Sequence, residues 1–195
     1  MTVLGLLLAA GAGRRMGTPK ALLRDNTGTL FAARAIGVLL EGGCDSVLVV
    51  SGASAADATA LLDETGWTDD RAVEVVVAED WDEGMGASLR AGLSAALGTD
   101  SSCAMVSLVD LPDVGADVVR RVLVQTPCDT RALVRATYDG QPGHPVLLGR
   151  DHWAGVVDSA HGDKGARDYL TANPPVLVEC GDLATGRDTD SPEDL

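Results

Sequence analysis

Short apolar runs alternate along this chain with longer segments in which apolar residues recur at helical spacing. Apolar runs of this length are typical of strands that are buried on both faces. Strands and helices that alternate in this way predict a parallel sheet with right-handed crossover connections. The predicted strands are Val3–Ala10, Ser46–Gly52, Ala72–Asp80 and the beginning of Cys103–Asp113, and the predicted helices are Leu30–Glu41, Ala55–Glu64, Ala87–Leu97 and Asp117–Val124.

The alternation becomes less regular after residue 130. There we predict a strand at Ala132–Thr137, a turn at Tyr138–Gly143, a strand at His144–Gly149 and a helix around Ala166–Leu170. No linker rich in Gly and Ser, internal repeat or low-complexity run divides the 195 residues. We therefore predict a single Rossmann-like, three-layer α/β domain with a mostly parallel sheet and an irregular C-terminal cap.

The composition fits a parallel sheet and limits the classes of partner. Aromatic residues make up only 3% of the chain and hydrophobic residues 46%, so Val, Leu and Ala must build the core. The formal net charge of −14 argues against nonspecific binding to nucleic acid or to a membrane surface. We expect neither kind of partner.

The first apolar run is not expected to be a targeting or membrane segment. A secretory signal carries positive charge before its apolar run, and no basic residue precedes Val3–Ala10. The run is also much shorter than the about 20 residues that span a bilayer. We therefore expect a cytoplasmic protein. Its four cysteines show neither C-x-x-C nor zinc-like spacing, so we expect them to be small buried hydrophobic residues.

The sequence GAGRRMGTPK, residues 11–20, follows the first predicted strand. Its glycines allow backbone N–H groups to approach an anion closely. Four basic residues precede Asp25, the first acidic residue of this otherwise acidic chain. The spacing fits neither the dinucleotide-binding G-x-G-x-x-G nor the Walker G-x-x-x-x-G-K. An ordinary strand-to-helix turn is one interpretation. The cations favour the other, a phosphate-binding loop in which Arg15 and Lys20 neutralise phosphate charge.

A second glycine turn, EGMGASLRAG at residues 83–92, lies at the start of a predicted helix. Gly84 and Gly86 flank Met85, and Ser88 follows two residues later. Such a turn can present a helix N-terminus to a polar ligand. A plain N-cap formed by Ser88 is an equally good interpretation of these residues.

The segment SLVDLPDV, residues 107–114, places Asp110 directly after a buried strand. Ligands bind at the carboxyl edge of such a sheet, where this carboxylate would hold Mg²⁺ together with phosphates and waters. A turn or capping role is the alternative, and Asp113 would serve it equally well. Near the end of the chain, Ser191-Pro192 predicts the start of a helix.

The segment LAAGAGRRMGTPK, residues 8–20, resembles the signature of the molybdenum cofactor nucleotidyltransferases, which are NTP transferases of the sugar-nucleotide type. That signature runs L-A-[AG]-G, then R-[MFL]-G, then K, with the spacing found here. Its Leu-Ala-Ala-Gly form resembles the cytidylyltransferase branch more than the guanylyltransferase branch. The resemblance extends to segments along the whole chain. It implies one nucleotide-diphospho-sugar transferase domain over residues 1–195, with residues 1–130 binding nucleotide and residues 131–195 on the acceptor side.

The resemblance also implies roles for individual residues. Asp110 would be a magnesium ligand, and either Asp188 or Asp190 of the closing D-T-D-S-P-E-D-L element, with Asp190 favoured, would be a second. Nucleotide would be bound by Leu8, Ala9, Ala10, Gly11, Gly13, Arg15, Lys20, Gly52, Gly86 and Ser88. The acceptor would be bound by His144, Asp163, Lys164 and Arg167, with a structural hydrogen-bonding role as the alternative for His144.

The implied activity is Mg²⁺-dependent transfer of a nucleoside monophosphate from an NTP, CTP being favoured, to a phosphorylated pterin acceptor, molybdopterin. Pyrophosphate would be released, and a molybdoenzyme would receive the product. Because the acceptor phosphate is already anionic, Arg15, Lys20 and Asp110 would act by positioning and charge neutralisation.

Three alternatives remain open. The first is a transferase of the same fold that uses GTP or another phosphorylated acceptor. The second is an NAD(P)H oxidoreductase of the nicotine blue type. The acidic residue expected after its second strand is missing, because Val50-Ser51-Gly52 stands there. The third is a non-catalytic carrier of a nucleotide or a pterin.

Overall fold

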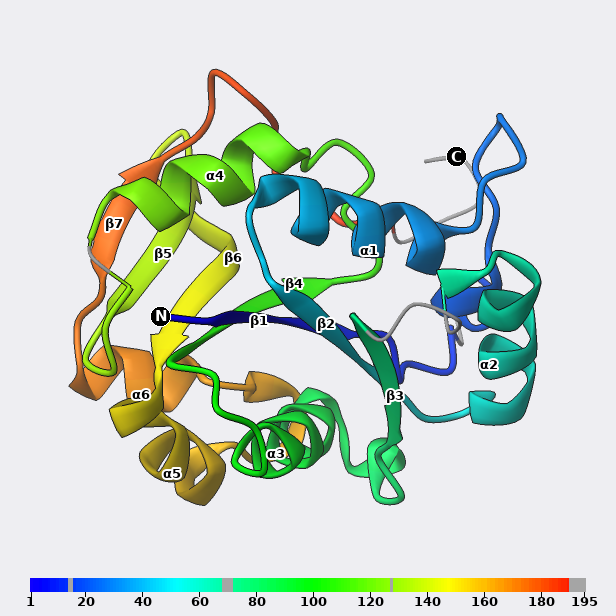
Figure 1. The fold of residues 1–195 in the computed structure, drawn as a ribbon, viewed down its shortest axis with the longest axis horizontal. Helices are drawn as coiled ribbons and strands as arrows, with labels where there is room; N and C mark the ends of the chain where they lie inside the picture. Colours follow the sequence, from blue (N-terminus) through cyan, green and yellow to red (C-terminus); the bar gives the residue numbers. More distant parts are fainter. Residues whose placement is uncertain (14–15, 68–71, 127, 190–195) are drawn as a thin grey trace.

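The computed structural model describes residues 1–13, 16–67, 72–126 and 128–189, and the strands within them form one seven-stranded sheet. The strand order is β3-β2-β1-β4-β6-β5-β7 (Figure 1). All neighbouring pairs are parallel except the two that contain β6. The strands are β1 (Val3–Leu8), β2 (Ser46–Ser51), β3 (Val73–Val77), β4 (Cys103–Leu108), β5 (Leu133–Tyr138), β6 (Gln141–Gly149) and β7 (Val176–Glu179).

Helices cover both faces of the sheet and complete a three-layer domain (Figure 1). On one face lie α1 (Phe31–Gly42) and α4 (Ala116–Val124), joined by part of α2 (Ala55–Glu64). The other face is covered by α3 (Met85–Ala96), α5 (Arg150–Ser159) and α6 (Arg167–Ala172). Within the described ranges, no helix is both long enough and apolar enough to cross a membrane.

Strand β1 lies at the centre of the sheet and explains the unbroken apolar run near the start of the chain. All its residues are buried, with Leu7 in the core beneath α1 and α4 and Leu6 in the core beneath α3. Helix α3 approaches β1 closely at Gly92, where a Cβ atom would lie 2.6 Å from Leu6 Cδ1. The sequence prediction of a mostly parallel α/β sheet is confirmed.

The C-terminal part of the chain is more regular than the expected cap. Strands β5, β6 and β7 extend the same sheet, and α5 and β7 were not predicted. Strand β6 runs antiparallel because it follows β5 through a two-residue hairpin turn, Asp139-Gly140, with φ of 51° and 76°. Positive φ at both positions is the geometry that Asp-Gly favours in tight hairpins.

For two of the four cysteines, the expectation of isolated buried hydrophobic residues is wrong. Cys103, at the start of β4, forms a disulfide with Cys128, and their Cα atoms are 6.4 Å apart. The pairing follows from the tertiary fold, which returns the chain to the start of β4 after 25 residues, so the spacing of the cysteines contained no signal for it. Cys44 and Cys180 are free and buried, as expected.

Candidate active site

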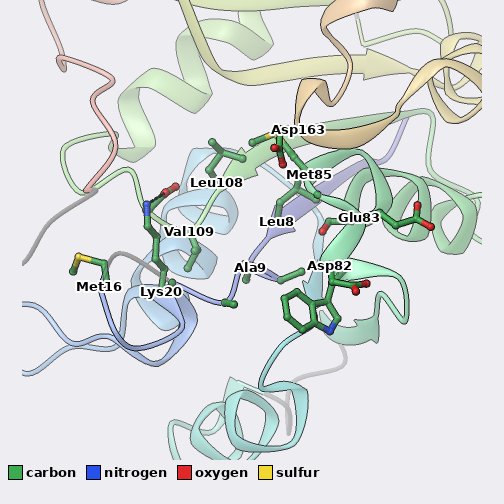
Figure 2. Close-up of a pocket in the computed structure, with 18 residues that line it drawn as sticks. Leu8, Ala9, Met16, Lys20, Asp82, Glu83, Met85, Leu108, Val109 and Asp163 are labelled. Carbon is green, nitrogen blue, oxygen red and sulfur yellow. Dashed lines mark hydrogen bonds and ion pairs between the residues drawn. The ribbon is translucent and has the colours of Figure 1, made fainter.

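The central parallel strands end side by side at one edge of the sheet and form the floor of a cavity. Beyond β1, the Ala9 N–H donates to Val50 O at 2.9 Å, and beyond β4 the Val109 N–H donates to Leu8 O at 3.2 Å. This first cavity has a volume of about 480 Å³. Its walls are formed by Leu8, Ala9, Ala10, Gly11, Ala12, Gly13, Met16, Lys20, Trp81, Asp82, Glu83, Gly84, Met85, Ser88, Leu108, Val109, Asp110 and Asp163 (Figure 2).

The glycine loop brings Lys20 back to this floor. Gly13 has φ of 59°, and a Cβ atom there would lie 1.8 Å from Thr18 O, so the tight loop requires glycine. The loop leads through Pro19 into the short helix η1 (Lys20–Leu22). Leu8, Ala9, Ala10, Gly11, Gly13 and Lys20 all line the first cavity, as the sequence predicted for a common site. Arg15 lies outside the described residues.

Lys20 and Asp110 form an ion pair at the floor of the first cavity. Lys20 Nζ lies 2.6 Å from Asp110 Oδ2, and the two side chains are only 18% and 15% exposed. The residues are 90 positions apart in the sequence and meet because β1 and β4 are neighbours. Each side chain therefore neutralises the other in this structure.

The C-terminal tail contacts both Asp110 and Asp113, but in different ways. Thr189 donates its backbone N–H to Asp110 O at 2.9 Å. Asp113 instead accepts hydrogen bonds on Oδ2 from the backbone N–H and the hydroxyl of Thr185, at 2.5 and 2.6 Å. Asp113 thus anchors the tail, which leaves Asp110 as the carboxylate of the pair that lines the cavity. Asp190 and the predicted helix start at Ser191-Pro192 lie outside the described residues, and Asp188 is exposed.

The charged groups around the first cavity are mostly acidic. Lys20 and Met16 lie on one side, and Asp82 and Glu83 lie on the opposite side (Figure 2). With Asp110 and Asp163, four carboxylates and one ammonium line the described part of the wall. The described residues contain no cluster of three or more His, Cys, Asp or Glu that could hold a metal by itself. Among the described residues, Lys20 is the single cation that an anionic ligand would meet in this cavity.

The second glycine turn forms one wall of the first cavity, and the helix that follows it starts earlier than predicted. Helix α3 begins at Met85 rather than Ala87, and its N-cap residue is Gly84, with φ of 115°. Ser88 is therefore not the cap; it is buried in the first turn and faces the cavity. Gly86 and Gly52 do not line the cavity but allow close packing around it. A Cβ atom would lie 2.9 Å from Ala160 O at Gly86 and 2.7 Å from Ala10 O at Gly52.

A second cavity of about 120 Å³ adjoins the first and shares Leu8, Met85 and Asp163 with it. It brings together His144, Asp163, Lys164 and Arg167, which the sequence assigned to one acceptor site. Its other walls are Leu89, Arg135, Val106, Val146, Leu148, Gly165, Ala166 and Leu170. Lys164 is exposed and pairs with Asp168 at 3.0 Å.

Burial and positive charge control protonation in the second cavity. Burial, followed by the charge of Arg135, lowers the pKa of His144 to about 4, so its imidazole is neutral at pH 7. Burial and then the charge of Arg167 also lower the pKa of Arg135. His144 has a structural contact as well, because its carbonyl accepts a hydrogen bond from the Tyr138 hydroxyl at 2.6 Å.

Several cavity residues were missed from the sequence, among them Met16, Trp81 and Arg135. Met16 and Trp81 line the first cavity and Arg135 lines the second. Trp81 lies in η3 (Trp81–Glu83), just after β3, where the carboxyl end of a parallel strand is itself a signal. Arg135 is a single charged residue within a predicted strand. Its place in the second cavity depends on how β5 pairs with β6, which the local sequence does not indicate.

An open, mostly parallel sheet with a glycine loop, a lysine and a carboxylate at its carboxyl edge defines an α/β protein of the nucleotide-binding type. Residues 5–176 match the MobA-like NTP transferase domain, and the chain belongs to this family. Its class of activity is therefore nucleotidyl transfer.

Relatives of known name and structure cover nearly the whole chain. The nicotine blue oxidoreductase of Paenarthrobacter nicotinovorans is 35% identical over 99% of this chain and 94% of its own length. Rv0371c from Mycobacterium tuberculosis has a TM-score of 0.79 and 27% identity, covering 100% of this chain and 95% of its own. Its manganese complex has a TM-score of 0.73 and 25% identity, covering 100% and 96%. A nucleotidyl transferase from Methanothermobacter thermautotrophicus shares the fold, with a TM-score of 0.79 and 20% identity over 99% and 94%.

Proposed function

We propose that the chain is a Mg²⁺-dependent cytidylyltransferase that transfers CMP from CTP to a phosphorylated pterin acceptor, molybdopterin, and releases pyrophosphate. The observation that carries this proposal is the meeting of Lys20, Asp110 and the glycine loop in one cavity at the carboxyl edge of the sheet. The Leu8-Ala9-Ala10-Gly11 form of the loop supports CTP over GTP. The adjoining second cavity would receive the acceptor, and a molybdoenzyme would accept the product.

The residues of the first cavity would act by positioning and charge compensation. Backbone N–H groups of the glycine loop would approach the phosphates, and Lys20 would exchange Asp110 for a phosphate oxygen. Arg15 would add a second cation to the loop. An oxygen of the acceptor phosphate then attacks the α-phosphorus as the bond to pyrophosphate breaks, so the reaction requires no strong base.

The donor set suits a divalent metal that arrives with the nucleotide. Asp110 offers hard carboxylate oxygens at the cavity floor, with Asp190 as the proposed second ligand, and Mg²⁺ commonly uses one or two carboxylates plus substrate phosphates. When bound there, Mg²⁺ would neutralise charge that develops on the reacting phosphate groups. The acidic wall supports this requirement, and the manganese complex of Rv0371c shows a divalent metal with a relative.

Binding and turnover in a pair of aspartate variants test the proposal. Tryptophan fluorescence provides the binding signal, because Trp81 lines the first cavity while Trp153 is fully buried in the core. We expect Asp110→Asn to reduce Mg²⁺-dependent turnover far more than the affinity for CTP. Asp113→Asn is the matched comparison; Asp113 lies outside the first cavity and holds Thr185, so its loss should reduce Mg²⁺-dependent turnover much less than the loss of Asp110. Full Mg²⁺-dependent turnover in Asp110→Asn would refute the proposed site.

A second candidate function is NAD(P)H-dependent oxidoreduction, which the name of the 35% identical relative favours. Against it, β2 ends at Ser51-Gly52, and Gly52 packs against Ala10 and Trp81, leaving no carboxylate for a ribose. The same fluorescence titration with NADH and NADPH separates the two functions. Saturable binding of either dinucleotide, with no response to CTP and Mg²⁺, would favour the oxidoreductase.

A further inference from the structure

Two arginines converge on the second cavity from different elements. Arg135 projects from β5 and Arg167 from the start of α6, and both line the cavity beside the neutral imidazole of His144. Arg135 donates its Nε–H to Gly143 O at 3.1 Å, which fixes the direction of its guanidinium. After burial, the nearby charge of Arg167 is the second cause that lowers the pKa of Arg135.

No ion pair among the described residues compensates this pair of like charges, although the exposed Asp163 carboxylate also lines the second cavity. Among the residues that the structure describes, neither guanidinium takes part in an ion pair, whereas Arg90, Arg120, Arg121 and Arg131 each have an acidic partner. Arg135 is partly buried, so water screens its charge less than at the surface, whereas Arg167 is exposed. One partly buried and one exposed guanidinium, neither held in an ion pair among the described residues, line the same cavity and form a site that an anion would stabilise.

The walls of the second cavity limit the size and polarity of the anionic group that can bind there. Leu89, Val106, Val146, Leu148 and Leu170 make most of the second cavity apolar, and its volume is only about 120 Å³. A guanidinium presents its N–H groups in a fixed fork that matches phosphate oxygens in a bidentate way. The site therefore suits one compact phosphate group rather than an extended chain of phosphates.

We infer that Arg135 and Arg167 together bind the phosphate monoester group of the acceptor, an inference that rests on the proposed function for its choice of ligand. Arg135 is then a binding residue that the family signature does not mark. Lys164, which is exposed and paired with Asp168, is a less important contact. His144 would contact the phosphate without adding a third positive charge.

Inorganic phosphate in the absence of nucleotide is the probe, and ¹⁵N-labelled histidine provides the signal. The chain has only three histidines, so His144 can be followed by NMR against His152 and His161 as internal references. Phosphate at constant ionic strength should shift the His144 signals and raise the melting temperature. Arg135→Gln and Arg167→Gln should each weaken phosphate binding by about 10-fold or more, as expected for the loss of a charge-assisted hydrogen bond. Acetate should bind more weakly than phosphate.

Two matched variants locate the bound phosphate. Arg131→Gln removes an exposed arginine outside the second cavity, and Lys20→Gln removes the cation of the first cavity; both should keep the phosphate-induced shift. The inference is overturned if His144 does not respond, if the response survives in either Arg135→Gln or Arg167→Gln, or if Lys20→Gln abolishes it. Binding of CTP and Mg²⁺, measured separately by fluorescence, should be unchanged in Arg135→Gln. If the wild-type protein does not bind CTP but still binds phosphate at His144, the proposed function is refuted and the anion site is retained.

Discussion

At the floor of the first cavity, Lys20 and Asp110 form an ion pair with each other. Their 2.6 Å contact means that neither group is available to substrate until the other is released. A nucleotide that arrives with Mg²⁺ would supply a phosphate for Lys20 and a cation for Asp110 at the same time. Binding of nucleotide and metal should therefore be coupled.

The exchange predicts opposite effects of one substitution on two ligands. Lys20→Met should lower the affinity for CTP with Mg²⁺, or kcat/KM, by about 10-fold or more, because a charge-assisted phosphate contact is lost. The same change should raise the affinity for Mn²⁺ alone, because Asp110 loses its competing cation. Calorimetric titration of Mn²⁺ with and without CTP measures both. Lys164→Met is the control, since Lys164 pairs with Asp168. A weaker Mn²⁺ affinity in Lys20→Met would contradict the exchange.

At the scale of elements, the start of α3 is positioned by a close contact with the chain after α5. A Cβ atom at Gly86 would lie 2.9 Å from both Ala160 O and His161 C, which are backbone atoms that cannot rotate away. Glycine at this point lets Met85 and Ser88 reach the cavities. The close packing of α3 against the Ala160–His161 backbone thus supports the site.

Gly86→Ala should destabilise the fold by about 1–3 kcal/mol, as overpacking typically does, and weaken CTP binding. Gly37→Ala is the matched control in α1, because a Cβ atom there has only Trp67 nearby, at 3.9 Å. Replacing this helical glycine should stabilise the protein by up to about 1 kcal/mol. Urea unfolding compares the two variants. Equal stability of Gly86→Ala and wild type would mean that α3 is not held as tightly as the structure indicates.

The sequence predicted elements well wherever local pattern and burial agree. Helix α2 has its predicted bounds, and the strands of the parallel half were found because they are mostly apolar. Helix α5 was missed because charged and polar residues interrupt its first turn, and β7 because it is a short edge strand with exposed Val176 and Leu177. The structure brings the described loop residues and Asp110 to the first cavity, and the residues expected on the acceptor side to the second, while their roles stay predictions. Arg135, Trp81 and the disulfide depend on contacts between distant segments, which local patterns do not contain.

At the scale of the whole molecule, two groups connect stability to pH in separate ranges. The hydroxyl of Thr137 and the backbone N–H groups of Gly181, Gly140 and Asp139 lower the pKa of Glu179 to about 2. This carboxylate joins β7 to the β5–β6 hairpin. His144, whose pKa is lowered to about 4, lies on β6 of the same hairpin.

The sign of the effect follows from the direction of each shift. The unfolded chain binds a proton on its histidine near pH 6.5, before the folded chain does, so stability falls as pH drops from about 6.5 towards 4. Glu179 contributes stability above about pH 4.5, which is lost as pH falls towards 2. Urea unfolding at successive pH values measures the free energy of unfolding. His144→Gln should reduce its change with pH in the upper range, and Glu179→Gln should reduce it in the lower range. His161→Gln is the exposed control, and a His144→Gln profile identical to wild type would contradict the burial of this imidazole.

The most direct measurement of the central claim is pyrophosphate release by the wild-type protein with each NTP in turn, Mg²⁺ and molybdopterin. We expect release that requires both Mg²⁺ and the acceptor, is fastest with CTP, is lost in Asp110→Asn and persists in Asp113→Asn. If release is fastest with GTP, the protein is still a nucleotidyltransferase, but its preferred nucleotide is GTP rather than CTP. No release with any NTP, from a protein that binds CTP and Mg²⁺, would show a carrier and contradict the account.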